Sequence, residues 1–153
     1  MTAAEKSQPT LEQRRARHAY EAVQRAQQKE GAHEKQDPKK FGGQARKLPI
    51  RIVASGLGQA LAFLKSKNYA PGLLVEIADW VLDQRTRREG DPPRDNQRRP
   101  SDDALLRHVI EGNSDTMRRA TAEVLAYLVW LNRFAEAEGL SELEGSTAAE
   151  GES

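Results

Sequence analysis

The sequence predicts an all-α fold, a compact single-domain bundle of five or six helices. Three observations lead to this prediction. Apolar residues recur at intervals of three or four along most of the chain, which is the period of an amphipathic helix. Alternating runs of β-branched and aromatic residues bounded by turns, the signature of strands, are nearly absent. With 153 residues, the chain has the length of one domain and no room for a second core of useful size.

The first helix is predicted to begin after Thr10. Thr10 and Gln13 have the spacing of a capping box, in which each residue binds the backbone N–H of the other. Apolar residues then continue at helical spacing to Ala26, and we expect the helix to fray near Gly31. Residues 1–9 are predicted to form a flexible N-terminus.

A second helical stretch is predicted from about Lys39 to Lys67. Pro49 should kink or restart it, because proline supplies no N–H to the residue one turn back. The apolar residues beyond the proline step by three or four and predict one buried stripe, widened by Ile52 and Phe63: Ile50, Val53, Leu57, Leu61 and Leu64.

A third helix should follow a turn at residues 68–72. Its buried side is predicted to carry six apolar residues: Leu73, Leu74, Ile77, Trp80, Val81 and Leu82. Residues 84–100 are predicted to form an exposed basic loop, because residues 89–100 are too polar and too rich in proline to pack.

Two more helices complete the predicted helical domain, which spans residues 10–138. A short one starts at Ser101 and ends at Gly112, and its apolar residues are Leu105, Leu106, Val109 and Ile110. Asn113 or Ser114 should cap the last helix, which we expect to be the central element of the core. Its predicted seam consists of Met117, Thr121, Val124, Leu128 and Leu131.

The net charge of +1 hides a strong asymmetry. Residues 1–135 carry all 24 Lys and Arg but only 17 Asp and Glu, whereas the last 18 residues carry six acidic side chains and no basic one. Residues 139–153 are therefore predicted to form an acidic, disordered tail on a basic body. The absence of cysteine and of any long apolar run predicts a soluble cytoplasmic protein without disulfides.

No combination of residues indicates an active site, a metal site or a cofactor. Glu30 and His33 have the E-x-x-H spacing of di-iron bundles, but such sites need two of these pairs and two further glutamates, so a solvated helix end is the preferred reading. His18 with Glu21 and His108 with Glu111 are read as surface helix pairs. No nucleophile elbow is present.

The basic residues are more informative than the acidic ones. They gather on the first helix, around Pro49, at the start of the last helix and around the predicted loop, where they are Arg85, Arg87, Arg88, Arg94, Arg98 and Arg99. Long, charged side chains of this kind bind phosphates. Aromatic residues make up only 5% and most lie on apolar stripes, so we expect contact with the backbone and shape of a nucleic acid rather than stacking on its bases.

Three stretches resemble a known family, and together they cover most of the predicted helical body. They read LEQRRARHAY at 11–20, RKLPIRIVASGLGQALAFL at 46–64 and RRATAEVLAYLVWLNRFAEA at 118–137. Their order and spacing are similar to the small subunit of type III-B CRISPR effectors, the Cmr-type RNA-guided complexes. One departure is Ser55, where the family carries Asn before Gly56-Leu57; serine can cap or hydrogen-bond in a similar way.

The resemblance implies a small helical protein of antiviral defence that has no catalytic activity of its own. Copies of such a subunit stack along the ribonucleoprotein, beside the repeated backbone subunit and in contact with the large palm-domain subunit. Their basic surface faces the guide RNA and target RNA. Charge then selects the residues that we predict to face RNA: Arg14, Arg15, Arg17, Lys39, Lys40, Arg46, Lys47 and Arg51, with Arg118 and Arg119 as further candidates.

Two alternatives remain open at this point. The chain would be a purely structural scaffold subunit if these cations pair with acidic patches on neighbouring subunits, and it would then have no RNA affinity at physiological salt. An enzyme, such as a metal-dependent hydrolase, is the less favoured alternative because no plausible ligand set is present.

Overall fold

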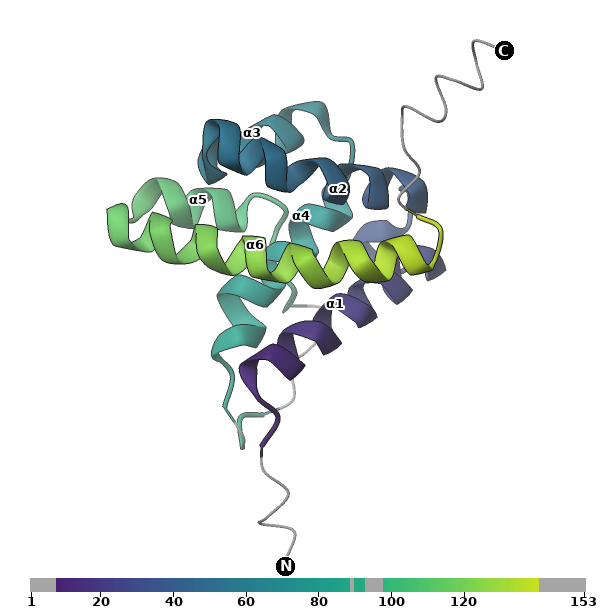
Figure 1. The fold of residues 1–153 in the computed structure, drawn as a ribbon, viewed down its shortest axis with the longest axis horizontal. Helices are drawn as coiled ribbons and strands as arrows, with labels where there is room; N and C mark the ends of the chain where they lie inside the picture. Colours follow the sequence, from purple (N-terminus) through teal and green to yellow (C-terminus); the bar gives the residue numbers. More distant parts are fainter. Residues whose placement is uncertain (1–7, 89, 93–97, 141–153) are drawn as a thin grey trace, which may run out of the picture.

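The computed structural model describes residues 8–88, 90–92 and 98–140, and these form an all-helical domain (Figure 1). Its six α-helices are α1 (Leu11–Gln28), α2 (Pro38–Ser55), α3 (Leu57–Lys67), α4 (Pro71–Ala78), α5 (Ala104–Glu111) and α6 (Ser114–Ala137). The predicted all-α class is thus confirmed. The predicted flexible N-terminus and acidic tail fall almost entirely on residues 1–7 and 141–153, outside the described residues.

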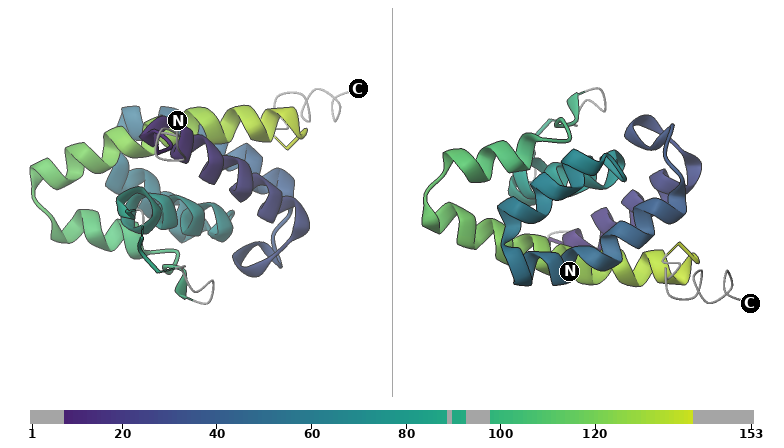
Figure 2. Two further views of the ribbon diagram at one scale, coloured as in Figure 1. Left: turned by 90° about the horizontal axis from the view of Figure 1, so that it is seen from below. Right: turned by 90° about the horizontal axis from the view of Figure 1, so that it is seen from above.

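The longest helix, α6, packs along α1 and α2, and Figure 2 shows α1 and α6 side by side. Helices α1 and α6 begin at the predicted caps. Thr10 and Gln13 form the capping box of α1, and the Asn113 side chain accepts a hydrogen bond of 2.9 Å from the backbone N–H of Thr116. In α6 the seam is buried at Val124, Leu128 and Leu131. Helix α6 therefore contributes one buried side to the core, while the most deeply buried segment of the domain is α4.

Helix α2 continues through Pro49 without a break, so of the two outcomes predicted for this residue, a kink or a restart, the restart is wrong. Proline leaves the carbonyl of Ala45, one turn earlier, without its helical donor. The side-chain amide of Asn132 in α6 donates a hydrogen bond of 3.0 Å to this carbonyl. A contact with a neighbouring helix therefore satisfies the group that the proline leaves free.

The chain instead turns at Gly56, between α2 and α3. Gly56 has φ +89°, a conformation that residues with a Cβ rarely adopt. Because the helix axis changes direction there, the apolar stripe predicted across residues 50–64 does not continue from one helix to the other. Ile50 and Val53 are 75% and 78% exposed, and Ile52 faces the core in their place, with Leu57 buried beyond the turn.

Helix α4 is the most deeply buried segment, and it passes into a π-helical turn, η3 (Asp79–Asp83), and a 3₁₀ turn, η4 (Gln84–Thr86). Every residue from Gly72 to Val81 is buried, which confirms the predicted apolar face up to that point. Leu82 is half-buried. Residues 84–86 are helical although they lie in the predicted loop 84–100.

The C-terminal part of the domain differs from the prediction in two details. In α5, Val109 is buried but Ile110 is 69% exposed, because only one side of this short helix meets the core. Leu140, which the prediction assigned to the tail, is buried beside Gly42 of α2; a Cβ on Gly42 would lie 2.2 Å from the Leu140 carbonyl oxygen. None of the described helices combines the length and the apolar character needed to cross a bilayer.

Candidate nucleic-acid interface

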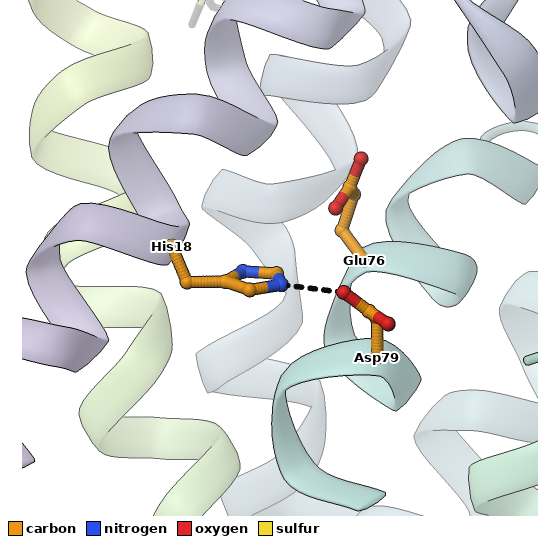
Figure 3. A group of neighbouring side chains, drawn as sticks. All are labelled: His18, Glu76 and Asp79. Carbon is orange, nitrogen blue, oxygen red and sulfur yellow. Dashed lines mark hydrogen bonds and ion pairs between the residues drawn. The ribbon is translucent and has the colours of Figure 1, made fainter. Parts of the chain in front are cut away.

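A cluster of charged side chains is enclosed where α1 meets α4. Glu76 on α4 and Asp79 at the start of η3 are both 0% exposed. Figure 3 shows His18 reaching from α1 to Asp79, with Glu76 about one turn earlier on the same helix as Asp79. Buried carboxylates are rare unless they are paired, so the partners of these two groups decide what the cluster does.

Glu76 is bound by three cationic or polar side chains. Arg25 of α1 donates two hydrogen bonds, of 2.9 and 2.8 Å, and Arg99 donates two more, of 3.3 and 2.7 Å, to the same carboxylate. His33 Nε2 lies 2.8 Å from Glu76 Oε2. Burial alone would raise the pKa of Glu76, but the hydrogen bonds from Arg25 and His33 and the nearby guanidinium charges hold it well below its ordinary value. Glu76 is therefore an anion at neutral pH.

Asp79 forms the second half of the cluster. Its Oδ2 lies 2.8 Å from His18 Nε2 and accepts a hydrogen bond of 3.0 Å from Arg99. The other ring nitrogen of His18, Nδ1, lies 2.7 Å from the Tyr127 hydroxyl of α6. Burial and the charge of Glu76 raise the pKa of Tyr127 well above its ordinary value, so the phenol is protonated. The network thus ties α1, α4, α6 and the segment around Arg99 together.

The cluster has the residue types of a metal site, and its geometry argues for an ion-pair network instead. Ligand atoms of His18, Glu76 and Asp79 lie within 4.8 Å of one another. However, both oxygens of Glu76 already accept hydrogen bonds from arginine, and His18 Nε2 is engaged with Asp79. A metal ion would have to displace guanidinium groups that already supply the positive charge. We therefore interpret the cluster as structural.

Sequence reasoning missed this cluster and misplaced two of its histidines. His18 is buried rather than paired with Glu21 on the surface, and His33 is 0% exposed rather than part of a solvated helix end. Arg99 was placed in an exposed loop, yet only 18% of its side chain is accessible. A usable signal was present, because Glu76 and Asp79 interrupt an otherwise apolar run, and a charge inside such a run needs a buried partner.

The three predicted RNA-facing residues of α1 occupy different environments. Arg14 donates hydrogen bonds to the carbonyls of Gln84, Arg85 and Arg87 at the end of η4. Arg15 forms a two-point ion pair with Glu123 of α6, at 2.7 and 3.1 Å, and a further pair with Glu12. Arg17 is exposed and has no ion pair with any described residue.

Glu123 has a third neighbour in addition to Arg15. The indole N–H of Trp80 donates a hydrogen bond of 2.8 Å to its carboxylate, which agrees with the core role expected for that tryptophan. Partial burial would raise the pKa of Glu123, but the bonds from Arg15 and Trp80 lower it below its ordinary value. Arg15 is thus engaged in packing α1 against α6.

The five predicted residues of α2 divide into two ridges on its outer face. Residues seven and eleven positions apart share one side of a helix. One ridge, which we name the α2 basic ridge, consists of Lys40, Lys47 and Arg51. The other, which we name the α2 mixed ridge, borders α6 and consists of Lys39, Arg46, Ile50 and Val53. Arg46 lies 3.9 Å from Glu136 of α6, which fixes the side on which this second ridge lies.

The α2 basic ridge faces two aromatic rings, that of Phe63 within α3 and that of Tyr69 just beyond its C-terminal end. The Arg51 guanidinium lies 4.5 Å from the centre of the Phe63 ring, and Lys40 Nζ lies 5.6 Å from the centre of Tyr69. Phe63 and Tyr69 are 38% and 39% exposed. Phe63 was predicted to be buried, and it lies at the surface because its side of α3 is turned toward the cations of α2.

The two predicted residues of α6, Arg118 and Arg119, lie together at the start of that helix. Both pair with Asp115, Arg119 at 2.8 Å, and their side chains remain 74% and 79% exposed. Exposed pairs of this kind contribute little to stability and leave the cations available to a partner. This group is separate from α2 in the chain and shares no ion pair with it among the described residues.

Three comparisons with known proteins indicate the same family. Residues 11–138 match the family described as CRISPR-associated protein (Cas_Cmr5). The chain is 35% identical over 123 residues to the CRISPR system Cmr subunit Cmr5 of Thermus thermophilus, a match that covers 80% of this chain and 90% of that protein. It also resembles the X-ray crystal structure of a CRISPR-associated Cmr5 family protein from the same species, with a TM-score of 0.60 and 31% identity over 84% of this chain and 96% of that one.

Proposed function

The chain belongs to the Cmr5 family of CRISPR Cmr complex subunits, and from this premise we propose that it is a non-catalytic subunit that touches RNA through the α2 basic ridge. Membership of the complex implies the other Cmr subunits and the guide RNA as its surroundings. The proposal concerns what this chain adds there, which is a positively charged surface for the backbone of guide and target RNA.

The charge of α2 is the observation that carries the proposal. This helix holds five lysines and arginines and no aspartate or glutamate from Pro38 to Ser55. Lys40 and Arg51 lie eleven residues apart along one ridge, about 16 Å at the rise of an α-helix. A row of cations over such a length can contact several successive phosphates. An ion pair with a single protein carboxylate would need only one of these cations.

The remaining predicted contacts have different support in the structure. Arg17, Arg118 and Arg119 are exposed and stay candidates for RNA contact, whereas Arg14 and Arg15 donate hydrogen bonds to other residues of the domain. We therefore rank the α2 basic ridge first.

RNA binding by the purified protein across a salt series tests this proposal. We expect sequence-independent binding whose log K falls with log salt. The double reversal Lys40→Glu, Lys47→Glu should reduce the slope by about 0.7 for each phosphate of a single strand that the variant no longer neutralises. The matched control reverses Arg107 and Arg133, which are exposed on α5 and α6. Equal weakening in the two variants would indicate a general charge effect and would contradict a role for the ridge.

A scaffold function is the second candidate, and one observation favours it. Ile50 and Val53 of the α2 mixed ridge are 75% and 78% exposed, and Val129 of α6, on the helix that Arg46 reaches, is 67% exposed. Exposed apolar residues beside charged ones are typical of protein contact surfaces. Under this alternative, Ile50→Glu should remove the chain from a reconstituted Cmr complex, while Lys40→Glu, Lys47→Glu should leave both assembly and RNA binding unchanged.

A further inference from the structure

A pocket of about 910 Å³ lies between the first turns of α1 and the segment that follows η3. This volume is within the range of roughly 300–1,000 Å³ typical of ligand sites. In Figure 1 these two walls, the start of α1 and the teal segment beyond α4, lie at the opposite end of the domain from α3. The pocket is therefore separate from the α2 basic ridge.

The charge of this pocket is strongly positive. Four arginines line it, Arg14, Arg17, Arg87 and Arg88, against the single carboxylate of Glu21. Arg87 pairs with Asp83 at 3.8 Å, whereas Arg17 and Arg88 are exposed and neither of these two side chains forms an ion pair within the described part of the chain. The like charges of Arg17 and Arg88 repel one another, so an anion bound between them would relieve that repulsion.

One of the arginines holds the pocket in shape. Arg14 Nη2 donates hydrogen bonds to the Arg85 and Arg87 carbonyls, at 3.2 and 3.1 Å, as well as to that of Gln84. Its guanidinium also lies 6.0 Å from the centre of the Trp80 ring. These contacts connect α1 to the η4 segment and fix the distance between the two walls. A ligand then meets a preformed site and need not order it.

The other lining groups limit what the ligand can be. Trp80 is 1% exposed, so its ring offers no face on which a base could stack. Both ring nitrogens of His18 are occupied by Tyr127 and Asp79. Guanidinium groups are left as the accessible recognition elements, and their planar arrays of donors match the oxygens of phosphate.

We propose that this pocket, which we name the α1/η4 pocket, binds a phosphate or diphosphate group through Arg17 and Arg88, with Arg14 and Arg87 in its walls. Two sources offer this chemistry, the backbone of an RNA strand and a free nucleotide or other phosphorylated small molecule. The site does not depend on the α2 basic ridge, so either proposal can fail without the other.

Calorimetric titration of the full-length protein with inorganic pyrophosphate tests the site. We expect saturable binding, and the double variant Arg17→Ala, Arg88→Ala should bind at least about tenfold more weakly, since it cannot form the charge-assisted hydrogen bonds. The control Arg118→Ala, Arg119→Ala removes the same two charges from α6 and should keep the affinity. Lys40→Glu, Lys47→Glu should also keep it. Unchanged melting temperatures would show that the variants fold.

Two results would overturn the proposal: no measurable pyrophosphate binding, or equal weakening in the pocket variant and the α6 control. A competition experiment then separates the two sources. An oligouridylate without terminal phosphates should displace pyrophosphate if the pocket takes the RNA backbone. Binding that this oligonucleotide does not displace would assign the pocket to a free phosphorylated molecule.

Discussion

The buried cluster around α4 and the outer face of α2 use the same kind of side chain for opposite purposes. In the cluster, Arg25 and Arg99 are largely enclosed and bind Glu76 at 2.7 to 3.3 Å. On α2, Lys40 lies at the surface, above the ring of Tyr69. Each enclosed cation has a carboxylate that compensates its loss of water, whereas the helix that carries the ridge contains no carboxylate at all. The first region uses its cations to hold helices together, whereas Lys40 of the second keeps its charge at the surface.

The largest difference between the two regions should appear when Glu76 is replaced by Gln. Arg25 and Arg99 would stay largely enclosed without the charge of their main partner, and removing one member of a buried pair typically costs about 3–5 kcal/mol. Chemical denaturation should therefore show a free energy of unfolding lower by that amount. The control Glu21→Gln, on the exposed side of α1, should stay within about 0.5 kcal/mol of the parent protein. A Glu76→Gln protein as stable as the parent would contradict the proposed role of the cluster.

The second-largest expected effect is a loss of stability when the cluster is exposed to acid. Because the pKa of Glu76 is lowered in the folded protein, its contribution to stability is fully present above its unfolded value near 4.5 and is lost as the pH falls toward the folded value. One such proton corresponds to a loss of about 2 kcal/mol between pH 4.5 and pH 3. Over this pH range, the melting temperature of the parent should fall more steeply with decreasing pH than that of Glu76→Gln. An equal fall in both proteins would show that Glu76 does not cause the acid sensitivity.

The joint between α2 and α6 should show a smaller effect. Asn132→Ala removes the donor that serves the Ala45 carbonyl, at an expected cost of about 1–2 kcal/mol. Pro49→Ala restores a backbone N–H for this carbonyl, so the cost of Asn132→Ala should shrink in the Pro49→Ala background. A double-mutant cycle measures the difference. Additive effects would show that Asn132 acts independently of the proline.

The smallest effect on stability should come from the α2 basic ridge itself. Lys40→Ala should change the free energy of unfolding by less than about 0.5 kcal/mol, because this side chain is exposed and surface substitutions usually have effects of this size. The same variant should weaken RNA binding at low salt if the ridge contacts phosphates. A large loss of stability in Lys40→Ala would place that residue among the structural cations.

Local sequence patterns were sufficient for the helical class and for the beginnings of α1 and α6, but they missed the break at Gly56 between α2 and α3. The capping box at Thr10 and the cap at Asn113 depend on residues within three positions, and the burial of Leu128 follows from helical spacing. The resemblance to the Cmr small subunit, which the comparisons confirm, likewise came from short stretches of residues. Such features can be predicted without knowing the tertiary contacts of the helices.

Tertiary structure alone decided which charges are enclosed and which helices continue. Arg99 meets Glu76, and Asn132 meets Ala45, across 23 and 87 residues of chain. His18 and Asp79 are separated by 61 residues. Spacing along the chain says nothing about such pairs, because they form only when helices cross. The amino-acid sequence by itself thus determined the class of fold and the basic character of the body, and packing decided which cations are enclosed beside carboxylates and which stay at the surface.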